Sequence, residues 1–286
     1  MGLGVGLAVP TLAEALRPWL PHMVALLLFC TGLRIGLRQG LGLRSDLAPA
    51  LTTILVLQLG LPLLALGLVY LLGWAATPLG LVLVLAVSAP SISGAPNFAA
   101  LMGHDPAPTL RLLVLGTALF PLTVLPVFWL LPALGSAQAA ILAALWLMLV
   151  IFGAISAGFA LRARTGPLSD HQRQSLDGIT VVLLAIIVVA LMSALGPALV
   201  STPITLLGWL ALAFALNFGA QWAAFVLSGQ GPTGTARGLV AGNRNLALFL
   251  VALPVEITDP ILIFIGCAQL PMYLTPMLLS RLYRRV

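Results

Sequence analysis

Long apolar runs separated by short polar turns account for most of the chain. An α-helix needs about 20 apolar residues to cross a hydrocarbon core of roughly 30 Å. Residues 1–10 are apolar but too few to span, so they are predicted to form an N-terminal stub. We predict nine full spans, at residues 21–37, 47–74, 77–103, 108–131, 138–161, 179–199, 204–227, 235–253 and 260–283.

Two of these predicted spans are interrupted. Residues 88–97 read SAPSISGAPN, in which two prolines, a glycine and three serines disfavour a continuous helix. Residues 238–248 read GLVAGNRNLAL, where polar residues and a glycine break an apolar run. Each interrupted span is therefore predicted to be two half-helices joined by an unwound segment.

The positions of the interruptions predict an inverted repeat. If the stub counts as a vestigial span, the chain divides into five plus five, and the interrupted helix is the fourth member of each half. Consecutive repeats with an odd number of spans must have opposite orientations. Broken helices at matching positions of inverted halves are typical of secondary transporters, whose site lies where the breaks meet at the midplane. The predicted fold is an all-α polytopic membrane protein with inverted five-helix repeats and two crossing broken helices.

Arg244 lies in the middle of the second interrupted span, about 13 Å of helix rise from each end. A mid-span arginine costs about 2.5 to 3.5 kcal/mol to insert, so it should face the protein interior or a wet cavity. No Asp or Glu lies inside a predicted span, so a substrate or water would complete its bonding. Its role is either to grip a carboxylate bidentately or to hold the two breaks together with a fixed charge. The alternative is that Arg244 only bonds to a structural partner within the protein.

Polar residues beside both breaks are the other candidates. Half-helices that begin near Asn97 and Asn245 would point free N–H groups and positive dipole ends at the crossing, which favours an anion. Alternatively, these side chains only satisfy backbone groups freed by the breaks. The predicted substrate-binding residues are Ser93, Asn97, Asn243, Arg244 and Asn245.

The composition agrees with a membrane protein and excludes several other classes. Of the 286 residues, 61% are hydrophobic and 7% are charged, which leaves no soluble domain. The 13 basic residues are all arginine and are spread along the chain at the ends of apolar runs, unlike the clustered basic face of a nucleic-acid-binding protein. Cys30 and Cys267 lie in apolar runs without CxxC spacing and are interpreted as packing residues.

The arginines also predict the orientation. Placed alternately on two sides, the loops give one side Arg34, Arg38, Arg44, Arg111, Arg162, Arg164, Arg173, Arg237, Arg281, Arg284 and Arg285, and give the other only Arg17. Because cytoplasmic loops are rich in Arg, we expect the C-terminus and the loop at residues 162–173 to be cytoplasmic, in an inner (plasma) membrane. We expect no enzyme, metal or cofactor, since no paired carboxylates, Ser and His pair or metal-ligand cluster falls at one depth.

From SAPSISGAPNFAALMGHD to GNRNLAL, and in span order over nearly its whole length, the chain resembles the bile acid:sodium symporter family. The resemblance implies a panel domain that rocks against a core domain containing the crossing helices. On this basis the panel would be residues 1–37 and 138–199, and the core residues 47–131 and 204–283. The shortened first helix is similar to family members with nine spans.

The resemblance also implies where sodium would bind, and this chain departs from that pattern. The polar pair after the first break reads Pro96 and Asn97, the hydroxyl positions read Thr109 and Leu113, the acidic position reads Val240 and the glutamine position reads Arg244. Asn97 and Thr109 remain as residual ion-site positions. Gln58 matches a further glutamine of the family with a one-residue offset. Sodium, a hard cation, prefers oxygen ligands, so arginine there argues against sodium coupling.

The predicted function is a secondary transporter of a small organic anion, carboxylate-like, that works by alternating access with weak or no sodium coupling. One alternative is an ordinary sodium-coupled organic anion symporter. Another, from a different class, is a receptor or sensor of the same fold that does not transport. The expected partners are the organic anion and the lipid bilayer, and not a nucleic acid.

Overall fold

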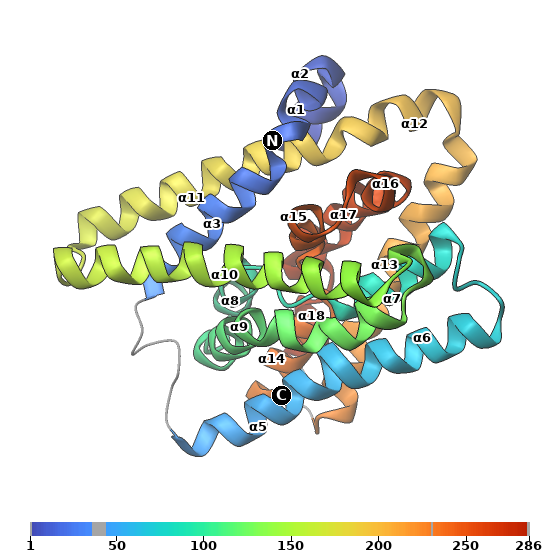
Figure 1. Cartoon of the computed structure of the whole chain (residues 1–286). Coiled ribbons are helices and arrows are strands. Elements are labelled where there is room, and N and C mark those ends of the chain that lie inside the picture. Colours follow the sequence, from blue (N-terminus) through green and yellow to red (C-terminus); the bar gives the residue numbers. More distant parts are fainter. Residues whose placement is uncertain (1, 36–43, 230, 285–286) are drawn as a thin grey trace.

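The computed structural model describes residues 2–35, 44–229 and 231–284, and the elements in this part of the chain are all helical (Figure 1). Seven helical runs are long and apolar enough to cross a membrane: Pro10–Arg34, Asp46–Leu71, Ala107–Leu130, Ala137–Thr165, Asp170–Ser201, Pro203–Leu227 and Val255–Leu278. The protein is therefore a multi-pass helical membrane protein. The two interrupted segments lie among these seven runs at the predicted places.

The first span begins earlier than predicted. Helix α1 (Gly2–Ala8) is separate, whereas α2 (Pro10–Leu16), the 3-10 turn η1 (Arg17–Trp19) and α3 (Leu20–Ile35) follow one another without a break. Pro10 occupies the first turn of α2, where its missing N–H costs nothing. The predicted start at residue 21 was wrong because Arg17 and Pro18 do not end the helix but fit a 3-10 turn. The predicted end at residue 37 lies outside the described residues.

The second span contains a π-helical turn. It consists of α5 (Arg44–Leu55), η2 (Val56–Gly60) and α6 (Leu61–Leu71). Within it, the Leu61 N–H bonds to the carbonyl of Val56, five residues back. Because Pro62 has no N–H, the next bond of this kind is missing.

Both interrupted spans are broken as predicted. The first consists of α7 (Pro78–Ser88) and α8 (Ala95–Leu101), and the second of α14 (Gly231–Gly242), the 3-10 turn η5 (Leu246–Leu248) and α15 (Phe249–Ala252). Neither contains a helix long enough to cross a membrane alone. Nine full crossings and the inverted relation of the two halves stay predictions.

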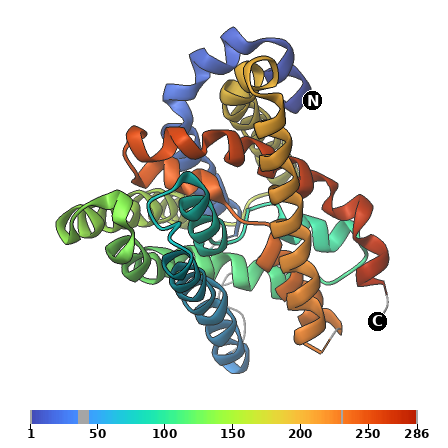
Figure 2. The same ribbon diagram turned by 90° about the vertical axis from the view of Figure 1, so that its right-hand side faces the viewer.

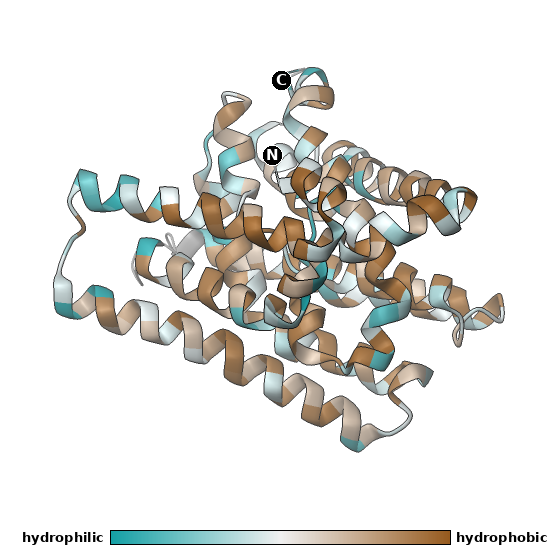
Figure 3. Cartoon of the chain, turned by 90° about the horizontal axis from the view of Figure 1, so that it is seen from above, coloured by the Kyte–Doolittle hydropathy of each residue, from teal (hydrophilic) through white to brown (hydrophobic). Residues whose placement is uncertain are grey.

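The remaining spans differ from the prediction mainly at their ends. The helices and 3-10 turns that form them are α9 (Ala107–Leu130), η3 (Pro132–Leu134), α10 (Ala137–Thr165), α11 (Asp170–Leu191), η4 (Met192–Ala194), α12 (Leu195–Ser201), α13 (Pro203–Leu227), α16 (Val255–Thr258), η6 (Asp259–Ile261), α17 (Leu262–Leu278) and α18 (Ser280–Tyr283). Helix α11 starts at Asp170 and not at residue 179, because Ser169 and Gln172 form a capping box. Helices α10 and α11 therefore make a long hairpin with a polar tip (Figure 3).

Helix α10 packs on both α3 and α9 and so links the helices around it. Helix α3 lies along α10 and α11, and α1 and α2 pack on α11. Helix α9 contacts α5 and α14, while α13 lies beside α14 and α17 (Figure 2). The division into a panel (residues 1–37 and 138–199) and a core (residues 47–131 and 204–283) stays a prediction, and the two names are used for these residues.

Glycines allow α3 and α10 to approach closely. A Cβ added at Gly158 would lie 2.5 Å from the carbonyl oxygen of Phe29, and one added at Gly32 would lie 2.7 Å from that of Ile155. Small residues at such crossings let two helix backbones pack directly in a membrane.

The substitution Gly158→Ala is therefore expected to lower the free energy of unfolding by about 1 to 3 kcal/mol, since the added methyl group forces α3 and α10 apart. Gly153→Ala is the matched control, because an added Cβ at Gly153 of the same helix meets nothing within 4 Å. Thermal unfolding in detergent measures both. Equal midpoints for the two variants would contradict close packing at Gly158.

Candidate functional site

The two interruptions contact each other directly. Ser91 and Arg244 form an antiparallel bridge. The N–H of Ile92 donates to the carbonyl of Asn243 (3.0 Å), and the N–H of Asn245 donates to the carbonyl of Pro90 (2.7 Å). Unwound backbone in a membrane must find partners other than its own helix. Here each interruption supplies them for the other, so the predicted meeting of the two breaks is confirmed.

Arg244 lies at this crossing with 6% of its surface exposed. Its guanidinium donates to three backbone carbonyls: Nε to Ala241 (2.7 Å), Nη1 to Ala89 (2.8 Å) and Nη2 to Leu57 (3.4 Å). Ala241 is in the last turn of α14, and Ala89 directly follows α7. Both carbonyls belong to helix C-terminal ends, which carry partial negative charge.

The third carbonyl is available because of Pro62. In an α-helix the carbonyl of Leu57 would accept from the N–H of Leu61, but this N–H bonds to Val56 in the π turn. The next possible donor would be residue 62, which is proline. The π turn therefore leaves the Leu57 carbonyl without these helical donors, and Arg244 supplies one.

These contacts bear on the predicted roles of Arg244. Its three hydrogen bonds join the two breaks and the second span, as a fixed charge that holds the breaks together would do. A guanidinium has five N–H donors, so two are left beyond these bonds. Arg244 also lines the adjacent cavity, which leaves a grip on an anion open.

A cavity of about 270 Å³ lies between the crossing and the panel. Its polar wall contains Ser93, Asn97, Arg244 and Asn245, with Gln269 and Tyr273 of α17. The facing wall comes from α3 and α11 of the panel and is apolar: Val24, Leu27, Leu184, Ile187, Val188 and Leu191. The polar groups lie among apolar residues such as Phe98, Leu101 and Met272, so the cavity lining is mainly apolar with its hydrogen-bonding groups on the side of the crossing.

The predicted residues fall into two groups. Ser93, Asn97, Arg244 and Asn245 line the cavity together. Asn243 lies outside its lining and is fully buried, with its amide donating to the carbonyl of Leu239 (3.0 Å). Its Oδ1 accepts from Thr275 (3.2 Å), so this side chain is bonded within the core.

The residual ion-site residue Thr109 is also fully buried and lies outside the cavity lining. Its hydroxyl, like that of Ser91, has no hydrogen-bond partner in the described part of the chain. Gln269 and Tyr273 were missed as cavity residues. Their spacing of four places them on one face of a helix, which is the signal that the sequence offered.

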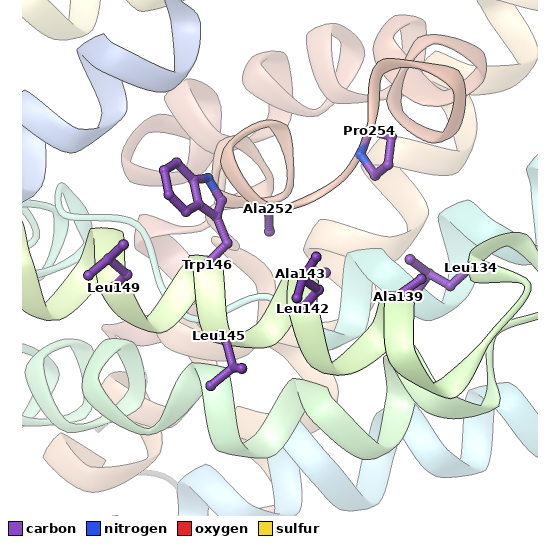
Figure 4. Close-up of a pocket in the computed structure, with 9 residues that line it drawn as sticks. All are labelled: Leu134, Ala139, Leu142, Ala143, Leu145, Trp146, Leu149, Ala252 and Pro254. Carbon is purple, nitrogen blue, oxygen red and sulfur yellow. The ribbon is translucent and has the colours of Figure 1, made fainter.

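Arg244 also borders a second, smaller cavity of about 30 Å³ with Asn217 and Ala241, which has room for a water molecule. A larger hollow of about 480 Å³ lies elsewhere, between α10 and the segment that contains Ala252 and Pro254 (Figure 4). The side chains around it are apolar, except for the indole N–H of Trp146, so it offers little to a polar ligand. The crossing and its 270 Å³ cavity are therefore the candidate site.

Within the described residues, no group of three or more His, Cys, Asp or Glu side chains is placed to hold a metal ion. No family model matches the chain, and no curated protein matches it.

Proposed function

We propose that this protein is a secondary transporter of a small organic anion, carboxylate-like, and a divergent member of the bile acid:sodium symporter family with weak or no sodium coupling. The observation that carries the proposal is the Arg244 guanidinium, which bonds to carbonyls of both interruptions and of the second span. Alternating access would come from the panel rocking against the core, with nine crossings in two inverted halves.

Arg244 is an argument for weak or no sodium coupling, because its guanidinium already occupies an environment that suits a cation. Backbone carbonyls of three segments surround its charge, as oxygen ligands surround a bound metal ion. A second cation about 4 Å away would be repelled by about 4 kcal/mol at an effective dielectric constant of 20. Val240 and Leu113 stand where the family has ion ligands, and both are buried apolar residues. The covalently attached charge would thus replace the ion.

The cavity supports an anionic substrate. Amides of Asn97, Asn245 and Gln269, together with the hydroxyl groups of Ser93 and Tyr273, offer hydrogen-bond donors beside the positive charge of Arg244. Among the described residues, no carboxylate lines this cavity. Hydrogen bonds from such donors to an ionised acceptor are about twice as strong as neutral ones. A volume of about 270 Å³ is near the lower end of ligand pockets, which favours a small molecule.

A sodium-coupled symporter is the second candidate, because the buried hydroxyl of Thr109 has no partner in the described residues and could still contribute an oxygen ligand. Sodium dependence of uptake separates the two proposals. A receptor or sensor on the same fold would bind the anion without flux in proteoliposomes.

The orientation is part of the proposal: an inner (plasma) membrane location with the C-terminus and the tip of the α10–α11 hairpin in the cytoplasm. The tip carries Arg162, Arg164 and Arg173 and is polar in Figure 3, as cytoplasmic ends of spans often are.

A cysteine at Ser169, in this tip, is accordingly expected to resist an impermeant thiol reagent added outside whole cells. Ser201→Cys is the control, because Ser201 is exposed at the other end of the same helical run and should react. The background needs Cys30→Ala and Cys267→Ala, and both cysteines are buried. Labelling at residue 169 with protection at residue 201 would reverse the orientation.

Substitution of Arg244 tests the function. Arg244→Lys keeps the charge but loses the planar fork, so substrate affinity should fall roughly 10-fold. Arg244→Gln removes the charge and should weaken binding by about 100-fold or more, as expected when one partner of a buried charged contact is lost. Substrate binding and uptake of candidate carboxylates in proteoliposomes, with and without sodium, measure these effects.

The matched control is Arg237→Gln, which removes an arginine of α14, the helix that precedes Arg244; Arg237 donates to Thr53 and lies outside the cavity lining. It should leave affinity within about two-fold of the wild type, as is usual for substitutions away from a site. Strong sodium dependence of wild-type uptake, or unchanged binding in Arg244→Gln, would contradict the proposal.

A further inference from the structure

A network of uncharged side chains lies behind the second interruption. Its centre is Gln221 of α13, which is fully buried. The Gln221 Nε2 donates to Asn217 Oδ1 (2.6 Å) and to Thr275 Oγ1 (3.0 Å), and its Oε1 accepts from the Tyr283 hydroxyl (2.9 Å). Three helices, α13, α17 and α18, are thereby joined by side-chain hydrogen bonds.

The network ends on the two residues that precede Arg244. Asn217 Nδ2 donates to the carbonyl of Gly242 (2.8 Å) and, more weakly, to Asn243 Oδ1 (3.4 Å). Thr275 Oγ1 also lies within hydrogen-bond distance of Asn243 Oδ1 (3.2 Å). The side chains of α13 and α17 therefore bond to the backbone and side chain at the end of α14.

These bonds satisfy carbonyls that a helix end leaves free. An α-helix ends with four carbonyls that lack helical donors. At the end of α14, the carbonyl of Ala241 accepts from Arg244, that of Gly242 from Asn217 and that of Asn243 from Ile92. Asn217 thus caps α14 from a neighbouring helix, between the bond from Arg244 and the bond from the first interruption.

We propose that Asn217 and Gln221 are positioning residues for the transport site, because they fix the end of α14 so that Arg244 and Asn245 reach the crossing and the cavity. The proposal deepens the transport function and rests on it for the substrate readout.

Glycines show how closely α14 lies against the network. A Cβ at Gly242 would overlap the carbonyl oxygen of Asn217 and the side chain of Gln221, and one at Gly238 would lie 2.6 Å from the Tyr283 hydroxyl. The first interruption has no comparable support at Ser91, whose hydroxyl lacks a partner in the described residues. The network thus supports the second interruption, and the first interruption is bonded to the second.

Asn217→Leu tests the proposal, because it keeps the side-chain size and removes the donor to Gly242. Gly219→Ala is the control on the same helix, since an added Cβ at Gly219 meets nothing within 4 Å. Amide hydrogen exchange of the peptide that contains residues 242–246 should rise about 10-fold in Asn217→Leu and stay unchanged in the control, because the Asn245 N–H is then less well held against Pro90. This readout needs no substrate.

Substrate affinity gives the second readout. Asn217→Leu should weaken binding about 10-fold in wild type but by less than about 3-fold in the Arg244→Lys background, since residues that act through each other are not additive. Additive losses, or exchange at residues 242–246 equal to that of the control, would overturn the positioning role. If the wild type binds no anion, the transport function fails, while the exchange measurement still decides whether the network holds the crossing.

Tyr283→Phe covers the case in which Asn217→Leu does not fold. It removes one hydroxyl and keeps the ring that packs edge-on against Phe225, with centroids 5.1 Å apart. It leaves Gln221 Oε1 without this donor, so exchange at residues 242–246 should rise about 3-fold. No change in this variant would likewise count against the network as a positioning device.

Discussion

Backbone carbonyls that converge inside a membrane protein need a positive partner, and the architecture of the crossing follows from this constraint. The ends of α7 and α14 and the π turn of the second span each present a carbonyl to the same region. An unsatisfied polar group in an apolar environment costs several kcal/mol, and water is scarce at this depth. Arg244 supplies three donors and a charge at once. Its insertion cost is offset by the groups that it satisfies.

The crossing also depends on residues that create free carbonyls. The π turn diverts the Leu61 N–H from Leu57 to Val56 and Pro62 offers no N–H in its place, while the two interruptions free the carbonyls of Ala89 and Ala241. Each of these features would be unfavourable alone. Together they form a set of acceptors that a planar guanidinium with several N–H groups satisfies better than a lysine ammonium would.

The sequence predicted the interruptions and the burial of Arg244, because proline, glycine and charge are visible against an apolar background. It did not predict the partners of Arg244. Leu57 is an ordinary leucine whose carbonyl becomes available only through a π turn, and nothing in its side chain indicates this. Asn217 and Gln221 were overlooked because they lie in another span, and periodicity does not show which face of an apolar helix meets which neighbour.

The errors at helix ends have a local cause. The early start of α11 comes from the capping box at Ser169. This signal is present in the sequence, but the prediction followed the apolar run, which begins later. Similarly, the predicted start of the first span at residue 21 was too late, because a 3-10 turn accommodates Arg17 and Pro18 and the helical run begins at Pro10. Apolar content marks where a helix can lie in lipid, whereas capping and turn chemistry decide where it begins.

The fixed charge at the crossing has a consequence for the membrane itself. On the proposed placement of Arg244 midway through the bilayer, its charge would raise the energy of any proton or hydrated cation that approaches along the cavity, as an arginine does in water-selective pores. Such a barrier would need no conformational change. The same guanidinium that binds the helix ends together would thus protect the proton gradient of the cell from leakage through the protein.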